Sequence, residues 1–157
     1  MRLGSQIQAV SRRVAGLIVV AGALLDQDGR VLIAERPPGK HMAGRWEFPG
    51  GKVAIDESPE QALQRELREE LGVEVAQADF VMELVHSYPD REVQLRFYVV
   101  DAFVGQPQSL DGQRLRWVTP AQLDHADILE ADLPFIRALQ QRARDGKMSP
   151  AAATPVA

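Results

Sequence analysis

Three glutamates crowd a short stretch of the chain, where their carboxylates could act together. The segment GGKVAIDESPEQALQRELREELGV, residues 50–73, places Glu66, Glu69 and Glu70 within five positions. At about 100° per residue on a helix, these side chains fall within an arc of roughly 100° and are neighbours in space. Grouped carboxylates of this kind are the ligands that hard divalent cations prefer. The spacing therefore raises the hypothesis of a metal site on one side of a helix.

A simpler interpretation is a surface helix on which arginines pair with the glutamates. Arg65 and Arg68 are interspersed with them, and taken alone the run RELREE favours this interpretation because charge runs usually face solvent. However, Leu63, Leu67 and Leu71 form an adjacent apolar stripe that can dock on a sheet. The carboxylates then lie along the edge of the buried face, which is a position that suits a cleft.

The glutamates belong to a longer pattern of 23 residues. The pattern runs Gly51, five residues, Glu57, seven residues, and then RELREELGV at positions 65–73. It matches the Nudix box without a departure, and the chain resembles the Nudix hydrolases over roughly residues 14–139. Within that family it is most similar to the MutT subgroup, because WEFPGGK stands at 46–52 and YPDR at 88–91.

The resemblance implies both a fold and a reaction. The implied fold class is α/β, an α/β/α sandwich with a central mixed sheet and the box helix packed on it. The implied reaction is hydrolysis of a nucleoside diphosphate linked to another group, with Mg²⁺ or Mn²⁺ as cofactor. Metal ions suit this chemistry because negative phosphate oxygens repel a nucleophile.

The resemblance also implies roles for individual residues near the box. Metal ligation is expected from the Gly50 carbonyl and from Glu66, Glu69, Glu70 and Asp111; the last, in DGQ, is one methylene shorter than the glutamate associated with this position in MutT. Glu66 is expected to orient or deprotonate water, with Glu69 and Glu70 chiefly as ligands and Arg65 pairing with the carboxylates. Two roles stay open for Glu57: metal ligation through water, or bracing of the glycine loop.

Substrate contacts are expected by the same resemblance from Arg36, Phe48, Asp90 and Asp132. MutT proteins commonly have asparagine where this chain has Asp132. An ionised carboxylate only accepts hydrogen bonds, so it could receive the N7 proton of 8-oxoguanine but would meet O6 poorly unless burial raised its pKa. It could equally accept an amino proton from cytosine. A third role is N-capping of the helix that follows.

Composition limits the possible partners and compartment. With 22 acidic and 18 basic residues the net charge is −4, which provides no positive field for polymeric nucleic acid. The absence of cysteine excludes disulfides and zinc–thiolate sites. The apolar run AGLIVVAGALL at 15–25 is too short to span a membrane. We expect a cytoplasmic protein with a small nucleotide substrate and no obligate protein partner.

The chain reads as one domain, residues 13–144, between flexible ends at 1–12 and 145–157. Two helices are predicted, at 58–72 with Ser58 as N-cap and Gly72 as stop, and at 133–144. Strands are predicted at 14–25 and 30–35, joined as a hairpin through DQDG, and at 80–87, 93–104 and 115–118. The first strand is apolar on both faces and should be covered on both sides.

These observations favour a metal-dependent nucleoside triphosphate pyrophosphohydrolase of the MutT type, which converts 8-oxo-dGTP to 8-oxo-dGMP and pyrophosphate and so cleanses the nucleotide pool. A Nudix hydrolase preferring (d)CTP or another nucleoside diphosphate derivative is the nearest alternative. A Nudix-fold sensor that binds a nucleotide without hydrolysis is less favoured, because a sensor would not require a water-activating Glu66.

Overall fold

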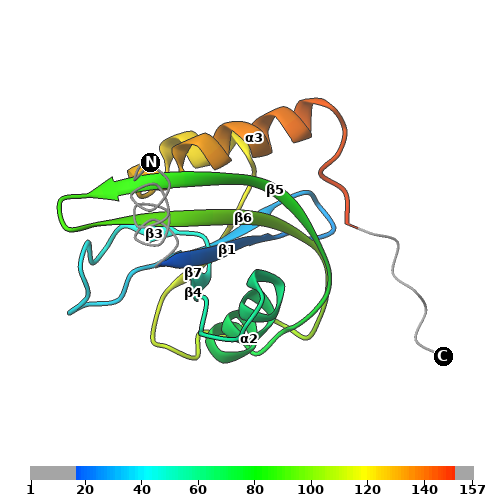
Figure 1. The fold of residues 1–157 in the computed structure, drawn as a ribbon. Coiled ribbons are helices and arrows are strands. Elements are labelled where there is room, and N and C mark those ends of the chain that lie inside the picture. The colour runs from blue at the N-terminus through cyan, green and yellow to red at the C-terminus, as the bar shows by residue number, and fades with distance from the viewer. Residues whose placement is uncertain (1–16, 151–157) are drawn as a thin grey trace, which may run out of the picture.

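Two sheets and two long helices make up the part of the chain that the computed structural model describes, residues 17–150 (Figure 1). The strands are β1 (Ile18–Leu24), β2 (Val31–Glu35), β3 (Trp46–Glu47), β4 (Gly50–Lys52), β5 (Glu74–Tyr88), β6 (Arg91–Val104) and β7 (Leu115–Val118). The helices are α2 (Pro59–Leu71) and α3 (Leu133–Arg144), with short 3-10 helices η1 (Ala121–His125) and η2 (Glu130–Asp132) before α3.

The larger sheet is mixed and lies between the two long helices. Its strand order is β4-β1-β6-β5, with β1 and β6 parallel and the other pairs antiparallel, and a second sheet has the order β3-β2-β7. Figure 1 shows α2 and α3 on opposite sides of the large sheet. The predicted α/β/α sandwich is thus confirmed.

Strand β1 is buried on both faces, as its apolar sequence predicts. Val20 and Leu24 join the cluster that contains Leu67 of α2. Ala23 joins the opposite cluster, which contains Phe135 of α3. Because successive strand residues point to opposite faces, β1 connects the two halves of the core.

The predicted hairpin between the first two strands is wrong. Beyond one isolated bridge between Leu25 and Val31, β1 and β2 do not pair, and they belong to different sheets. The tight turn exists, with Gly29 at φ 78° and the Asp26 amide 2.9 Å from the Arg30 carbonyl. However, β1 pairs with β4 and β6, whereas β2 pairs with β3 and β7 in the second sheet.

Both helices begin and end as predicted. The Ser58 hydroxyl accepts a hydrogen bond from the Gln61 amide at 3.1 Å, and the Gln61 side chain accepts one from the Ser58 amide at 2.9 Å. Gly72 ends α2 in the left-handed conformation at φ 71°. These caps satisfy backbone groups that a helix leaves unpaired at its ends.

The two short strands β3 and β4 were not predicted, because two or three residues on either side of Pro49 give no periodic pattern. At the other end of the domain, Met148 lies beyond the predicted boundary at Arg144 and is 8% exposed in the α3-side cluster. The predicted flexible segment 1–12 and residues 151–157 of the predicted tail lie outside the described residues. Within residues 17–150, no helix is long and apolar enough to cross a membrane.

We predict that Leu67→Ala lowers the free energy of unfolding by about 2–5 kcal/mol, since Leu67 is completely buried between α2 and the sheet. Leu133→Ala is the matched control because Leu133 is 45% exposed, and a change of at most about 1 kcal/mol is expected there. Urea unfolding of both variants measures the difference. Equal losses would contradict the packing described for α2.

Candidate active site

A cavity of about 450 Å³ opens between the β4 edge of the large sheet, the C-terminal half of α2 and the residues before α3. Seven of the predicted site residues line it: Arg36, Phe48, Gly50, Glu66, Glu70, Asp111 and Asp132. Four do not: Glu57, Arg65, Glu69 and Asp90. The fold therefore brings most, but not all, of the predicted residues to one place.

Arg65 is the centre of an ion-pair network beside the cavity. Its guanidinium donates to Glu57 at 2.7 and 2.9 Å, to Glu66 at 2.9 Å and to the Lys52 carbonyl at 3.0 Å. These hydrogen bonds join α2 to the segment that leaves β4. Arg65 thus fixes the carboxylate of Glu66 without lining the cavity itself.

Glu57 makes the contacts of a bracing residue. Besides Arg65, its carboxylate accepts a hydrogen bond from the Ala54 amide at 3.0 Å, and the hydrogen bond from Arg65 is the main cause that lowers the pKa of Glu57 to about 2. Of the two roles that the sequence left open for Glu57, these contacts favour bracing of the loop between β4 and α2.

The Glu66 carboxylate lies directly against the glycine strand. A Cβ atom on Gly51 would lie 2.4 Å from the Glu66 carboxyl carbon. The Glu66 side chain is 16% exposed, and its burial raises its pKa, while the hydrogen bond from Arg65 opposes that change. A side chain at Gly51 would therefore displace the Glu66 carboxylate, which Arg65 holds at 2.9 Å.

Glu70 and Asp111 form the part of the site in which negative charge is least compensated. Burial raises the pKa of Glu70 to about 8, and the charges of Glu66, Asp111 and Glu47 add to the effect. An amide hydrogen bond from Gly50 opposes this increase only in part. Neighbouring negative charges that raise the pKa of Glu70 in this way make a cation beside it favourable.

The donor set fits a hard divalent cation. Glu66, Glu70, Asp111 and the backbone of Gly50 line the same cavity and offer only oxygen ligands. Within residues 17–150, no three acidic or histidine side chains converge closely enough to enclose an ion in this conformation. Glu69, expected in the set, is 60% exposed and lies 3.4 Å from Arg65, outside the cavity.

At the other end of the cavity, an aromatic wall meets a partly buried ion pair. Phe48 is 3% exposed, and its ring meets that of Phe135 edge to face at 4.9 Å between centroids. Arg36 donates to Glu47 at 2.9 and 3.1 Å and to the His41 carbonyl at 2.6 Å. Burial raises the pKa of Glu47, although Arg36 opposes it. Glu47 was not predicted; its position between two buried aromatic residues in WEF was the available signal.

Asp132 is buried in the cavity wall and does not cap α3. It occupies the N-cap position but makes no side-chain capping hydrogen bond, and it is 8% exposed. Burial, helped by the charge of Glu47, raises the pKa of Asp132 to about 7, while a hydrogen bond from the Phe48 amide opposes the change. The capping interpretation is therefore wrong, and the carboxyl group faces other polar groups of the cavity.

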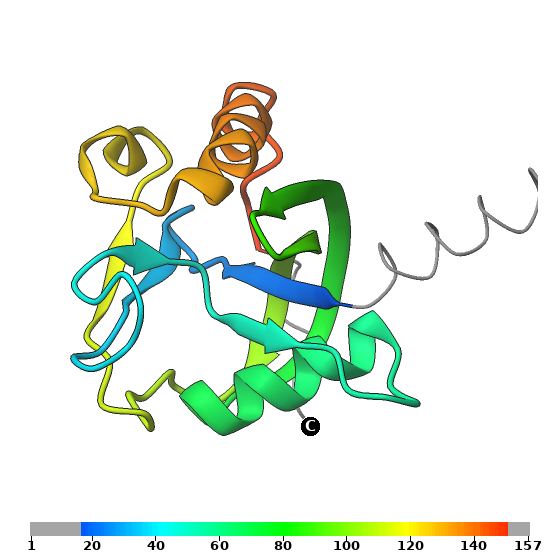
Figure 2. The same cartoon turned by 60° about the vertical axis from the view of Figure 1, so that its left-hand side comes forward.

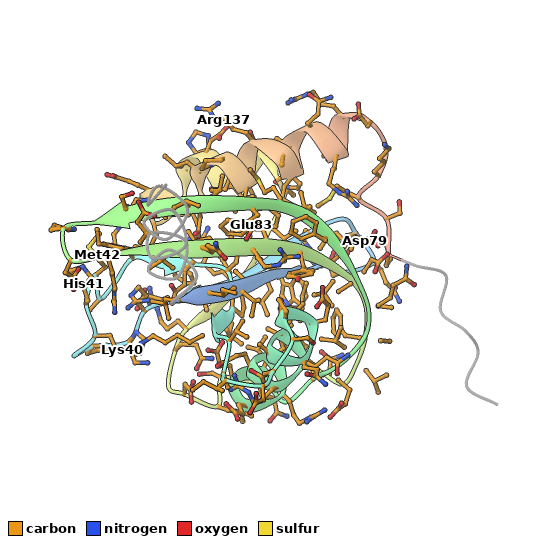
Figure 3. The ribbon with its side chains drawn as sticks, in the orientation of Figure 1. Lys40, His41, Met42, Asp79, Glu83 and Arg137 are labelled. Atoms are coloured by element: carbon orange, nitrogen blue, oxygen red, sulfur yellow. The ribbon has the colours of Figure 1, made fainter. Side chains whose placement is uncertain are left out.

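Asp90 is exposed in the turn between β5 and β6 and does not line the cavity, whereas its neighbours Tyr88 and Arg91 do. Lys40 and Lys52 also line it and were missed by the sequence interpretation. Figure 3 shows Lys40 beside His41 and Met42 on the loop between β2 and β3. An isolated lysine or arginine carries no sequence pattern that distinguishes a residue of a binding site from a solvated charge.

The family profile of the NUDIX domain matches residues 20–138. A CTP pyrophosphohydrolase of Escherichia coli K12 is 39% identical over 122 residues, which cover 78% of this chain and 90% of that protein. An 8-oxo-dGTP diphosphatase of the same strain is 34% identical over 125 residues, 80% of this chain and 97% of the relative.

Solved structures agree with these sequence relatives. The E. coli ORF135 protein superimposes with a TM-score of 0.74 at 36% identity, covering 90% of this chain and 94% of its own. A MutT structure from a study of Aliivibrio salmonicida and Vibrio cholerae gives a TM-score of 0.71 at 36% identity, covering 80% of this chain and 98% of its own.

We predict that Asp132→Asn stabilises the protein increasingly as pH rises. Because the pKa of Asp132 is raised from 3.8 to about 7 on folding, the folded state holds its proton more tightly, and stability is lost between pH 4 and pH 7 as the carboxyl ionises. Asparagine removes this loss. Urea unfolding should show a gain of about 1–3 kcal/mol at pH 8 and little at pH 4.

A pH-independent difference between the two proteins would show that Asp132 ionises as freely in the fold as in the unfolded chain. Asp90→Asn is the matched control, because Asp90 is exposed and does not line the cavity.

Proposed function

The chain belongs to the Nudix hydrolases, and from this we propose that it cleaves 8-oxo-dGTP to 8-oxo-dGMP and pyrophosphate with a divalent metal ion. The observation that carries the proposal is one cavity with two chemically different ends. Carboxylates of α2 lie at one end, and Phe48 with the buried Asp132 lies at the other. The charged triphosphate and the aromatic base of a nucleotide require these two different environments.

Glu66, Glu70, Asp111 and the Gly50 carbonyl would hold the metal ion, Mg²⁺ or Mn²⁺. When bound, the ion would neutralise phosphate oxygens and lower the pKa of water. The protein's own contribution is to gather oxygen donors at the α2 end of the cavity. Their number and hardness suit Mg²⁺ and Mn²⁺ better than softer metals.

Glu66 would orient the attacking water and accept its proton. Its carboxylate is held by Arg65 at 2.9 Å, and Arg65 is held in turn by Glu57 at 2.7 Å. Fixing a base in this way reduces the reorganisation that the reaction would otherwise require. Burial raises the pKa of Glu66, which makes it a stronger base than a free glutamate.

The base end of the cavity suits oxidised guanine. A protonated Asp132 can accept the N7 proton of 8-oxoguanine through one oxygen and donate to O6 through the other. With a pKa of about 7, the protonated form is well populated near neutral pH. Guanine lacks the N7 proton, so its N7 lone pair would face an acceptor. The ring of Phe48 provides an apolar surface beside the base.

A (d)CTP preference is the second candidate, and Asp132 is again the reason. Its carboxylate can accept the amino proton of cytosine. The relative that is 39% identical is named for CTP, which supports keeping this candidate. Either substrate would make the protein a nucleoside triphosphate pyrophosphohydrolase, and the 8-oxo-dGTP activity would lower mutation by removing the oxidised nucleotide before DNA synthesis.

We predict that Glu66→Gln folds normally but loses at least about 100-fold in kcat, since the amide cannot accept a proton from water. Pyrophosphate release at saturating Mg²⁺ measures the loss. Glu83→Gln on β5 is the control, because Glu83 pairs with Arg96 at 3.3 Å and does not line the cavity. Near-normal turnover in Glu66→Gln would assign the base to another residue.

The substrate is tested by kcat/KM for 8-oxo-dGTP, dGTP and dCTP. We expect 8-oxo-dGTP to exceed dGTP by at least about 100-fold, because the wrong purine leaves polar groups of the cavity unpaired. Equal values for the two purines would end the 8-oxo-dGTP proposal. A clear preference for dCTP would establish the second candidate, and no hydrolysis of any nucleotide would leave a binding protein.

A further inference from the structure

The loop between β6 and β7, residues 105–114, is fastened to the C-terminal end of α2, and Figure 2 shows the two segments beside each other. The Gln108 amide donates to the Leu71 carbonyl at 2.9 Å, and the Leu110 amide donates to the Glu70 carbonyl at 3.1 Å. Carbonyls in the last turn of a helix have no partner within the helix. The loop supplies those partners.

Gln113 adds a side-chain link at the same place. It is 7% exposed, and its Nε2 donates to the Glu70 carbonyl at 3.1 Å. Its Oε1 accepts from the Asp111 amide at 2.9 Å and from the Ser109 hydroxyl at 3.0 Å. A buried amide that is bonded at both ends is costly to displace, because moving it would leave buried polar groups unpaired.

The same link also holds the backbone of Asp111. One carboxamide joins the backbone of Asp111 to the backbone of Glu70, and the side chains of both residues line the cavity. The Asp111 backbone is thus held from the side of the helix, although the residue itself is exposed. Displacing the Gln113 amide would remove a link that holds the Asp111 backbone against the Glu70 backbone.

We propose that Gln113 is a positioning residue that sets the distance between the carboxylates of Asp111 and Glu70 and thereby the affinity of the site for a divalent cation. The proposal rests on the proposed function, because it assumes that these carboxylates hold the metal. Gln113 also lines the cavity, but its Oε1 already accepts hydrogen bonds from the Asp111 amide and the Ser109 hydroxyl, so it acts through its neighbours and not as a ligand. Residues that orient metal ligands typically affect affinity by 10- to 100-fold when they are replaced.

The experiment measures Mn²⁺ binding to the full chain without nucleotide, from the electron paramagnetic resonance signal of free Mn²⁺. Gln113→Met keeps the side-chain length and removes all three hydrogen bonds. Gln113→Asn keeps an amide that is too short to span both partners, so it remains informative if the methionine variant does not fold. Both should weaken Mn²⁺ binding by roughly tenfold or more.

The matched control is Gln140→Met. Gln140 also ties a helix to a loop, donating to the Pro120 carbonyl at 3.1 Å and to Asp124 at 2.9 Å, but it does not line the cavity. It should lose stability in urea unfolding comparably to Gln113→Met and bind Mn²⁺ as the wild type does. A general effect of losing an amide that ties a helix to a loop would instead weaken Mn²⁺ binding in both variants and overturn the proposal.

A double variant tests whether Gln113 acts through Asp111. Asp111→Asn alone should weaken Mn²⁺ binding, and adding Gln113→Met should weaken it no further. Additive losses, or wild-type affinity in the folded Gln113 variants, would overturn the inference. If the wild type itself bound no Mn²⁺, with or without nucleotide, the proposed function would fail instead, which keeps the two failures distinct.

Discussion

Crowding of negative charge at the edge of α2 is the constraint on which the site depends. On the outer side Arg65 relieves it, with hydrogen bonds to Glu57 and Glu66 of 2.7 and 2.9 Å. On the cavity side burial and the neighbouring carboxylates raise the pKa of Glu70 to about 8. On α2, an arginine thus offsets the repulsion on the outer side, and the proposed divalent cation would offset it on the cavity side.

At the opposite end of the cavity, burial also raises the pKa of a carboxyl group, that of Asp132. Asp132 is kept from solvent, and its raised pKa of about 7 gives the carboxyl group a donor as well as acceptors. Glu47, close enough to affect it, is itself held by Arg36. In the proposed function, selection of a base would therefore depend on the burial of Asp132 rather than on an additional positive charge.

The sequence predicted the elements whose signals are local. The α2 limits followed from Ser58 and Gly72, and the glutamate pattern identified the helix that meets the cavity. Long-range facts were not predictable in this way. Strand β2 lies in a different sheet from β1, where it pairs with β3 and β7. Glu69 lies outside the cavity, and helical spacing alone does not show which side chains a neighbouring strand covers. Glu47 and Gln113 act through hydrogen bonds with Arg36 and Glu70, 11 and 43 positions away, and no sequence motif records these pairs.

The central claim is that the carboxylates at the α2 edge bind a divalent cation used in hydrolysis. The most direct measurement is anomalous diffraction from a crystal soaked with Mn²⁺ and a triphosphate whose α,β-bridging oxygen is replaced by methylene. We predict an anomalous peak within about 2.5 Å of oxygens from Glu66 or Glu70 and from a phosphate. A crystal that contains the bound nucleotide but no such peak would contradict metal binding by these carboxylates, provided that Mn²⁺ supports turnover of the natural substrate.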